Sequence, residues 1–180
     1  MIEQYPVWDG NSGMLGGEDI ALIRELVRQI PTGQKPRLVV DLGAGSGTSA
    51  LAVFTAGRED IRVVSIDVRQ EALEATKANM EKYGFIERWQ GRMGRSDQIE
   101  WSKVHKIELL LCDSTHDYAS QADELNHWLP YVIQGGLVWV HDYTDRSRYP
   151  GVSMAIDEAI AAGRLAQIET RGLSWAGKRL

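Results

Sequence analysis

Residues 38–48 constrain the fold of this chain more than any other stretch. They read Leu-Val-Val-Asp-Leu-Gly-Ala-Gly-Ser-Gly-Thr, an apolar run with an acid, Asp41, followed by a loop with glycine at positions 43, 45 and 47. The apolar segment from Ser49 to Ala56 that follows is typical of a helix. A strand, a tight glycine turn and a helix start bring backbone amides and the positive end of a helix close to a bound ligand.

The spacing of these glycines separates two kinds of nucleotide ligand. Dinucleotide-binding loops follow the pattern G-x-G-x-x-G, whose third glycine eases helix packing under the pyrophosphate. Counting from Gly43, that third position is Thr48. With Asp41 before the loop and Asp67 after it, the G-x-G-x-G spacing favours an adenosyl ligand without a pyrophosphate. The ligand of that kind is S-adenosylmethionine.

The bulk composition argues against several other classes of protein. The chain has 180 residues and a net charge of -5, whereas a nucleic-acid-binding surface needs an excess of Lys and Arg. No apolar stretch approaches the ~20 residues that span a bilayer, and the first residues lack the pattern of a signal peptide. The single Cys112 follows an apolar run, which predicts a buried, reduced thiol. We expect one cytoplasmic domain that binds neither nucleic acid nor a membrane.

Apolar runs alternate with helical patterns along the chain, which predicts parallel strands joined by crossover helices. Residues 1–18 show no clear period and predict an irregular arm before a domain that spans residues 19–180. The strands predicted for the domain are Arg37–Leu42, Ile61–Asp67, Phe85–Gln90, Ile107–Asp113 and Leu137–Asp142, and a turn is expected at Gly135-Gly136. The helices begin near Glu18, Ser49, Arg69, Ala119 and Val152.

The end of the chain follows a different pattern. Leu165–Thr170 and Leu173–Lys178 are two short strands around Arg171-Gly172, and so short a connection makes an antiparallel hairpin. The expected fold is α/β, a Rossmann-like doubly wound sheet of seven strands, mostly parallel with an antiparallel C-terminal hairpin. Ligands of such sheets bind beyond the carboxyl ends of the strands. Four strands end at or near an acid, so these acids are expected to line one crevice: Asp41, Asp67, Asp113 and Asp142.

Three segments carry a resemblance to a known family. They are Asp113-Ser-Thr-His-Asp-Tyr118, Gly135-Gly-Leu-Val-Trp-Val-His-Asp-Tyr143 and Pro150-Gly-Val-Ser-Met-Ala-Ile-Asp-Glu158. With the glycine loop, they resemble the class I S-adenosylmethionine-dependent methyltransferases. Within that superfamily the chain is similar to the small-molecule O-methyltransferase branch that includes the cephalosporin hydroxylase and macrocin O-methyltransferase-like proteins. The first segment departs from the pattern at Thr115, where the family often has an acid.

The loop and the second strand supply the expected cofactor-binding residues. A carboxylate at Asp67 can accept hydrogen bonds from both ribose hydroxyls, and capping the following helix is its alternative or additional role. Val68 and Met93 are candidates to flank the adenine, with plain core packing as the alternative. Asp41 is expected to act indirectly, by ordering loop amides or through water. The remaining candidates for cofactor contact are Gly43, Ala44, Gly45, Ser46, Gly47 and Asp113.

Acids and histidines after the fourth and fifth strands are the candidates for catalysis. The resemblance implies that Asp113 and Asp142 match the acids that hold Mg²⁺ in divalent-metal O-methyltransferases, although the following residue, Tyr143, is a poor ligand. The alternative is a metal-free site in which Asp113 binds the sulfonium or ammonium group, while Asp142 binds the acceptor or caps a loop. His116 is a candidate general base and His141 a second one, because imidazole titrates near neutral pH.

These observations predict a methyltransferase that uses S-adenosylmethionine to methylate a small-molecule acceptor, most simply at oxygen. An adenosyl-binding protein without methyl transfer and an NAD-dependent oxidoreductase are the alternatives. Because the predicted N-terminal arm is short, a second copy of the chain in a homo-oligomer could complete the acceptor pocket.

Overall fold

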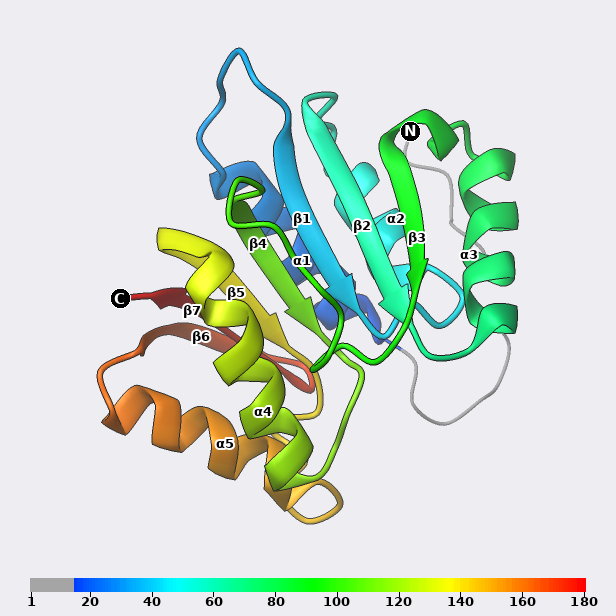
Figure 1. Ribbon diagram of the computed structural model, residues 1–180. Coiled ribbons are helices and arrows are strands. Elements are labelled where there is room, and N and C mark those ends of the chain that lie inside the picture. The colour runs from blue at the N-terminus through cyan, green and yellow to red at the C-terminus, as the bar shows by residue number, and fades with distance from the viewer. Residues whose placement is uncertain (1–14) are drawn as a thin grey trace.

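The computed structural model describes residues 15–180, and these form one seven-stranded sheet in the order β3-β2-β1-β4-β5-β7-β6 (Figure 1). The first five strands run parallel, and the last two are antiparallel to their neighbours. The predicted α/β fold with a C-terminal hairpin is therefore confirmed. Most of the predicted arm lies outside the described residues. The strands are β1 (Arg37–Leu42), β2 (Ile61–Asp67), β3 (Trp89–Met93), β4 (Ile107–Cys112), β5 (Val132–Val140), β6 (Leu165–Arg171) and β7 (Ser174–Arg179).

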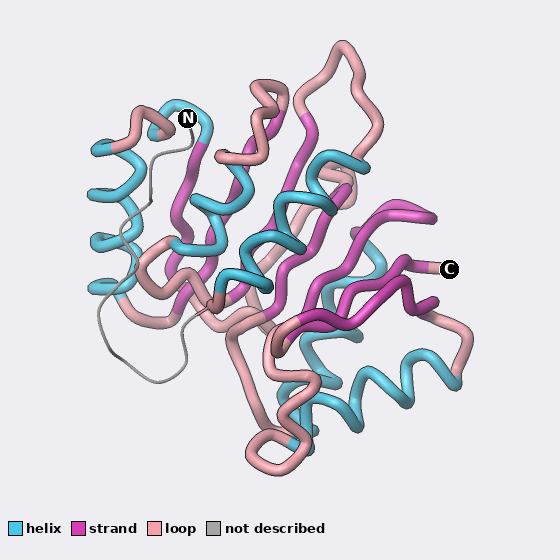
Figure 2. The backbone as a smooth tube through the Cα atoms, turned by 180° about the vertical axis from the view of Figure 1, so that it is seen from behind, coloured by secondary structure: helices cyan, strands magenta, loops and turns pink. Residues whose placement is uncertain are grey.

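Helices cover both faces of the sheet, as the view from behind shows (Figure 2). One face packs against α1, α2 and α3, and the other packs against α4 and α5. Among the described residues, no helix has the length and apolar character needed to cross a membrane. The helices are α1 (Gly17–Gln29), α2 (Thr48–Phe54), α3 (Gln70–Lys82), α4 (Tyr118–Trp128) and α5 (Pro150–Ala161), with short 3-10 turns at η1 (Ile86–Arg88) and η2 (Leu129–Tyr131).

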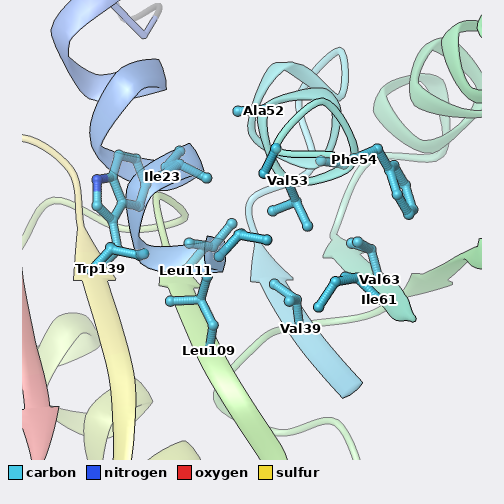
Figure 3. Packing of buried hydrophobic residues seen from close by; sticks show 14 of the residues in the cluster. Ile23, Val39, Ala52, Val53, Phe54, Ile61, Val63, Leu109, Leu111 and Trp139 are labelled. Atoms are coloured by element: carbon cyan, nitrogen blue, oxygen red, sulfur yellow. The ribbon is translucent and has the colours of Figure 1, made fainter. Parts of the chain in front are cut away.

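Strand β4 lies at the centre of the core. All six of its residues are buried, which is the expected consequence of a continuous apolar run in a sheet covered on both faces. Leu109 and Leu111 face the cluster that includes Ile23 of α1 and Val53 of α2 (Figure 3). Leu110 and Cys112 belong to the opposite cluster, and burial raises the pKa of the Cys112 thiol, which confirms the predicted buried cysteine.

Two predicted strands differ from the structure by more than two residues, and the other strand ends lie within two residues of the prediction. The third strand was expected over Phe85–Gln90, but it begins at Trp89, which pairs with Val63, and Ile86–Arg88 form a 3-10 turn. Phe85 instead stacks on Phe54 of α2, with ring centroids 4.9 Å apart. Its apolar character therefore serves packing between a helix and a turn rather than strand pairing.

The predicted turn at Gly135-Gly136 lies inside a strand. Strand β5 is continuous from Val132 to Val140, and its pairing with β4 shifts register between Ile107 and Leu109. Gly135 has φ 73°, a conformation that glycine adopts without steric cost. The glycines thus allow an irregularity that lengthens the strand instead of ending it.

Asp41 ties three elements together from inside the sheet. Its side chain is fully buried in β1, and it accepts hydrogen bonds of 2.7 Å from Ser49 Oγ at the start of α2 and from Ser65 Oγ of β2. Burial raises the pKa of the Asp41 carboxyl to about 6, although the two hydroxyls oppose this shift. The Asp41 carboxylate therefore binds two serine hydroxyls, and not the loop amides that the sequence suggested.

We predict that the stability of Asp41→Asn relative to the wild type increases as the pH rises. Native Asp41 keeps its proton to a higher pH than the unfolded chain does, so the wild-type free energy of unfolding falls between about pH 4 and about pH 6. The difference between variant and wild type should therefore shift by about 2 kcal/mol in favour of the variant between about pH 4 and pH 7. Denaturant unfolding at both pH values measures this difference. The exposed Asp123→Asn is the control, and a pH-independent difference for Asp41→Asn would contradict the prediction.

Candidate active site

A cavity of about 570 Å³ opens beyond the carboxyl ends of β1, β2, β3 and β4. Strand order reverses between β1 and β4, because the chain builds β2 and β3 on one side of β1 and returns to place β4 on the other. Loops that leave such a switch point diverge and leave a crevice between them. Each of the four strands contributes lining residues at or just beyond its end, among them Gly43, Asp67, Gly94 and Asp113.

The glycine loop forms one wall of this cavity. Gly43 has φ 89°, and a Cβ at this position would overlap the backbone oxygen of Asp113. The amides of Gly43 and Ala44 both donate to the Ile66 carbonyl oxygen, at 2.9 and 3.2 Å. The loop is therefore held against both neighbouring strands, and only a residue without a side chain fits at Gly43.

The structure divides the predicted loop residues into two groups. Gly43 and Gly45 line the cavity, whereas a Cβ on Gly47 would meet the side chain of Thr76 on α3. Ser46 accepts a hydrogen bond from Asn79 of α3 at its carbonyl oxygen. Ala44, Ser46 and Gly47 are not among the residues that line the cavity. The second half of the loop, Ser46 and Gly47, therefore packs against α3.

Asp67 lies at the end of β2 with its carboxylate in the cavity wall. Its Oδ2 accepts the Gly45 amide at 3.1 Å, and its Oδ1 accepts the Arg69 amide at 2.9 Å, just before α3 begins. Each carboxylate oxygen can accept more than one hydrogen bond. The contacts to the loop and to the helix start therefore leave lone pairs for a ligand hydroxyl, so ordering the backbone and binding a ligand are compatible.

Val68 and Met93 are not core residues. Their exposed fractions are 61% and 64%, so the core alternative considered for them is wrong. They lie close together because Asp67 and Met93 are register partners in β2 and β3. Val68 lines the cavity directly, and Met93 precedes the lining residue Gly94. Two exposed apolar side chains at the rim suit the face of a flat aromatic ligand.

The expectation that four acids line one crevice is wrong for two of them. Asp67 and Asp113 line the cavity, whereas Asp41 is enclosed in the sheet. Asp142 is also buried, and it is the only non-glycine residue with a positive φ, 58°, among those described. It turns back from the end of β5 toward two histidines rather than into the cavity.

These histidines and acids form one cluster. His116 Nε2 lies 2.9 Å from Asp142 Oδ2 and 4.0 Å from Asp113 Oδ1. His141 Nδ1 lies 3.3 Å from Asp113 Oδ1 and 3.4 Å from Asp142 Oδ2, and its Nε2 lies 3.7 Å from Asp19 Oδ2. The structure thus brings together all three predicted catalytic residues and both predicted metal ligands.

The charges in this cluster depend on one another. Burial alone would lower the pKa of His141, but the three surrounding carboxylates outweigh it and raise that pKa well above its usual value. The hydrogen bond to Asp142 raises the pKa of His116 as well. Burial would raise the pKa of Asp142, yet the two histidines reverse this and lower it. Asp113 differs, because burial dominates and raises its pKa.

The same cluster offers a donor set for a cation. One ligand atom from each of Asp113, His141 and Asp142 lies within 4.8 Å of the others. Both ring nitrogens of His141 are buried, and no described residue gives either of them a contact with hydrogen-bond geometry. Two carboxylates and an imidazole suit a divalent transition ion better than Mg²⁺, which prefers oxygen ligands only. Tyr143 does not contribute, because its hydroxyl donates to Asp157 Oδ1 at 2.7 Å.

Asp19 is a site residue that the sequence marked only as an acid at a helix start. It is buried, and its Oδ1 accepts the Leu173 amide at 3.0 Å and Ser174 Oγ at 2.6 Å from the C-terminal hairpin. The hairpin lies far from α1 in sequence, so no local pattern reveals this contact. Tyr149, at the end of the loop that the sequence suggested as a second wall of the acceptor site, lines the cavity, and its ring centroid lies 4.5 Å from that of His116.

Comparison with known protein structures agrees with this fold. The O-methyltransferase from Bacillus cereus in complex with SAH is similar in structure, with a TM-score of 0.74 and 16% identity over 94% of this chain and 84% of that one. The O-methyltransferase NovP gives a TM-score of 0.73 and 21% identity, covering 94% of this chain and 83% of NovP. At these identities, the two structures show the fold.

Sequence comparison gives a short match and a long one. A ribosomal protein L11 methyltransferase from Alteromonas mediterranea is 46% identical over 52 residues, which is 29% of this chain but only 17% of that enzyme. The family model described as a methyltransferase domain matches residues 40–143. That match covers more than half of the 180 residues and includes the glycine loop, Asp67 and the His–Asp cluster, so the chain belongs to this methyltransferase family, with the class I fold.

Proposed function

We propose that this methyltransferase binds S-adenosylmethionine in the cavity at the switch point and methylates a hydroxyl oxygen of a small molecule. The observation that carries the proposal is the placement of Asp67 and Asp113 in one cavity on either side of the glycine loop. The SAH bound to the similar Bacillus cereus enzyme supports the choice of ligand. SAH is the product that remains after S-adenosylmethionine has lost its methyl group.

The cavity suggests an orientation for the donor. Asp67 would accept the ribose hydroxyls, and the exposed pair Val68 and Met93 would flank the base. Asp113 lies on the far side of the glycine loop from β3, where the amino-acid end of the ligand would lie. S-adenosylmethionine supplies a methyl group on a positively charged sulfur, so the protein has to align the acceptor and exclude water.

His116 is the residue we assign as general base. Its Nε2 lies 2.9 Å from Asp142 Oδ2, so a neutral ring that donates from Nε2 keeps Nδ1 free to accept a proton from the acceptor hydroxyl. The side chain lines the cavity beside Tyr149, whose ring offers a flat apolar surface to the acceptor. A net charge of -5 and a cavity of about 570 Å³ favour a small acceptor over a nucleic acid.

We propose in addition that Asp113, His141 and Asp142 hold a divalent cation beside the acceptor. The support is the His141 imidazole, which lies between two carboxylates while neither ring nitrogen has a contact of hydrogen-bond geometry to a described residue. These residues would hold the ion, and its positive charge would lower the pKa of an acceptor hydroxyl group. With or without a bound cation, Asp142 orients His116 in this proposal.

Asp67→Ala is expected to weaken S-adenosylmethionine and SAH binding about 10- to 100-fold, because hydrogen bonds to a charged acceptor are lost. Isothermal titration calorimetry measures both affinities, with circular dichroism to verify folding. Glu71→Gln, at an exposed position on α3, is the matched control. Unchanged affinity would remove the ribose assignment. Binding of NAD in place of S-adenosylmethionine by the wild type would overturn the proposed donor.

His116→Gln is expected to lower turnover roughly 100-fold or more while leaving SAH affinity unchanged, because the base acts on the acceptor. The assay measures SAH formation with a panel of small phenolic and alcoholic acceptors, and with ribosomal protein L11 and RNA in parallel. His105→Gln, outside the cavity, should retain full turnover. Turnover with L11 or RNA alone would contradict the small-molecule proposal, and SAH binding without any turnover would favour a binding protein.

Mn²⁺ is expected to bind more tightly than Mg²⁺, because one of the three donors is an imidazole nitrogen. His141→Asp should reverse part of this preference, since it replaces nitrogen with oxygen. Titration of each ion into the chelator-treated protein, followed by calorimetry, measures the affinities, and the exposed Glu100→Gln serves as control. Full turnover in the presence of chelator, with no binding of either ion, would show that Asp113 and Asp142 are not ligands.

A further inference from the structure

A buried carboxyl group lies behind the cavity wall and has no role in the mechanism above. Glu124 is in the middle of α4 and is fully buried, and burial raises the pKa of its carboxyl group despite the hydroxyls of Ser114 and Ser96. Its Oε1 accepts a hydrogen bond from Ser114 Oγ. Its Oε2 is buried and makes no hydrogen bond to any described residue. Burying such a group is costly, which makes a purely passive role a poor explanation.

Glu124 is connected to two serines in the cavity wall. Ser114 follows Asp113 after β4, Ser96 lies in the loop after β3, and their hydroxyl oxygens are 3.4 Å apart. Both residues line the cavity. One turn further along α4, Trp128 Nε1 donates to the Ser96 carbonyl oxygen at 2.8 Å. The same helix therefore fixes the Ser96 backbone and orients the Ser114 hydroxyl.

These contacts set the hydrogen-bonding polarity of the wall. A serine hydroxyl has one proton and two lone pairs. Ser114 gives its proton to Glu124, so Ser96 gives its single proton either to the Ser114 oxygen, 3.4 Å away, or to Glu124 itself. Both protons are then used within the wall. The lone pairs that remain on the two oxygens present the cavity with acceptors only.

The position of the serines indicates which part of the donor they would meet. Asp67 is the expected ribose partner, and the wall continues from it through Val68 and Gly94 to Ser96. Asp113 and His116 lie toward the opposite end, where methyl transfer is expected. The ribose would therefore lie between the reacting sulfur and Ser96. Ser114 follows Asp113 directly, but its hydroxyl oxygen lies 3.4 Å from that of Ser96, so we expect this pair of hydroxyls to face the base.

We propose that Glu124 is a specificity-determining positioning residue that makes the Ser96 and Ser114 hydroxyls acceptors for the exocyclic amino group of adenine. This inference rests on the proposed adenosyl site. Adenine offers a donor at its 6-position, whereas the deaminated base, hypoxanthine, offers an oxygen there. A wall that presents only acceptors forms hydrogen bonds with the adenine amino group, but its oxygens stay unpaired against the oxygen of hypoxanthine. Sites that leave buried polar groups unpaired against the wrong ligand discriminate strongly.

The test compares SAH with its deaminated analogue, S-inosylhomocysteine, by isothermal titration calorimetry. The wild type is expected to bind SAH at least about 10-fold more tightly, in line with one lost and one opposed hydrogen bond. Glu124→Leu removes the acceptor and lets the Ser114 hydroxyl rotate, so the ratio should fall to within about twofold of unity. Glu124→Gln keeps an oxygen that can accept from Ser114 and should retain most of the wild-type ratio.

Ser114→Ala tests the same inference without altering the interior of α4, and it should lower the ratio as Glu124→Leu does. Glu100→Gln, at an exposed position in the loop between β3 and β4, should leave it unchanged. The proposed role would be overturned if Glu124→Leu or Ser114→Ala kept the wild-type preference for SAH over S-inosylhomocysteine. It would also be overturned if Glu124→Gln lost as much of this preference as Glu124→Leu. A wild type that binds neither ligand would instead refute the adenosyl site itself.

Discussion

The close approach of the glycine turn after β1 to the end of β4 is the constraint on which the rest of the site depends. Gly43 has no room for a Cβ against the Asp113 backbone, and its amide is bound to the Ile66 carbonyl oxygen of β2. This packing fixes the ends of three adjacent strands relative to one another. Asp67 and Asp113, two of the three acids that line the cavity, owe their positions to it. The enclosed Asp41, bonded to Ser49 and Ser65, supports the same junction from within the sheet.

The acids of the site have distinct roles because their surroundings differ. Asp67 remains in the cavity wall and orders backbone amides. Asp142 is turned away by its positive φ and pairs with His116, and Asp113 lies between the cavity and His141. The His–Asp cluster balances its charges internally, which allows several ionisable groups to be buried together. In the function that we propose, the same residues would also supply the general base and a cation site.

Much of the fold could be predicted from local patterns. The boundaries of β1 and β2 match the prediction to the residue, because a β-branched or apolar run between turn residues specifies a buried strand locally. The two errors, at β3 and β5, have one cause. Apolar or glycine residues were interpreted by their local meaning, whereas Phe85 is used for packing on Phe54, and Gly135 for an irregularity opposite β4.

The sequence by itself determined the glycine turn, the alternation of strands and helices, the terminal hairpin and the types of residue that follow each strand. These are properties of neighbouring residues. Only the tertiary structure decided which of those residues meet. Asp19 reaches His141 across 122 positions of sequence (141 − 19) because α1 packs beside the hairpin, and Glu124 reaches Ser114 because α4 folds back over the loop that precedes it. Burial then sets the ionisation of these groups, and burial is a property of the packed chain that no local pattern contains.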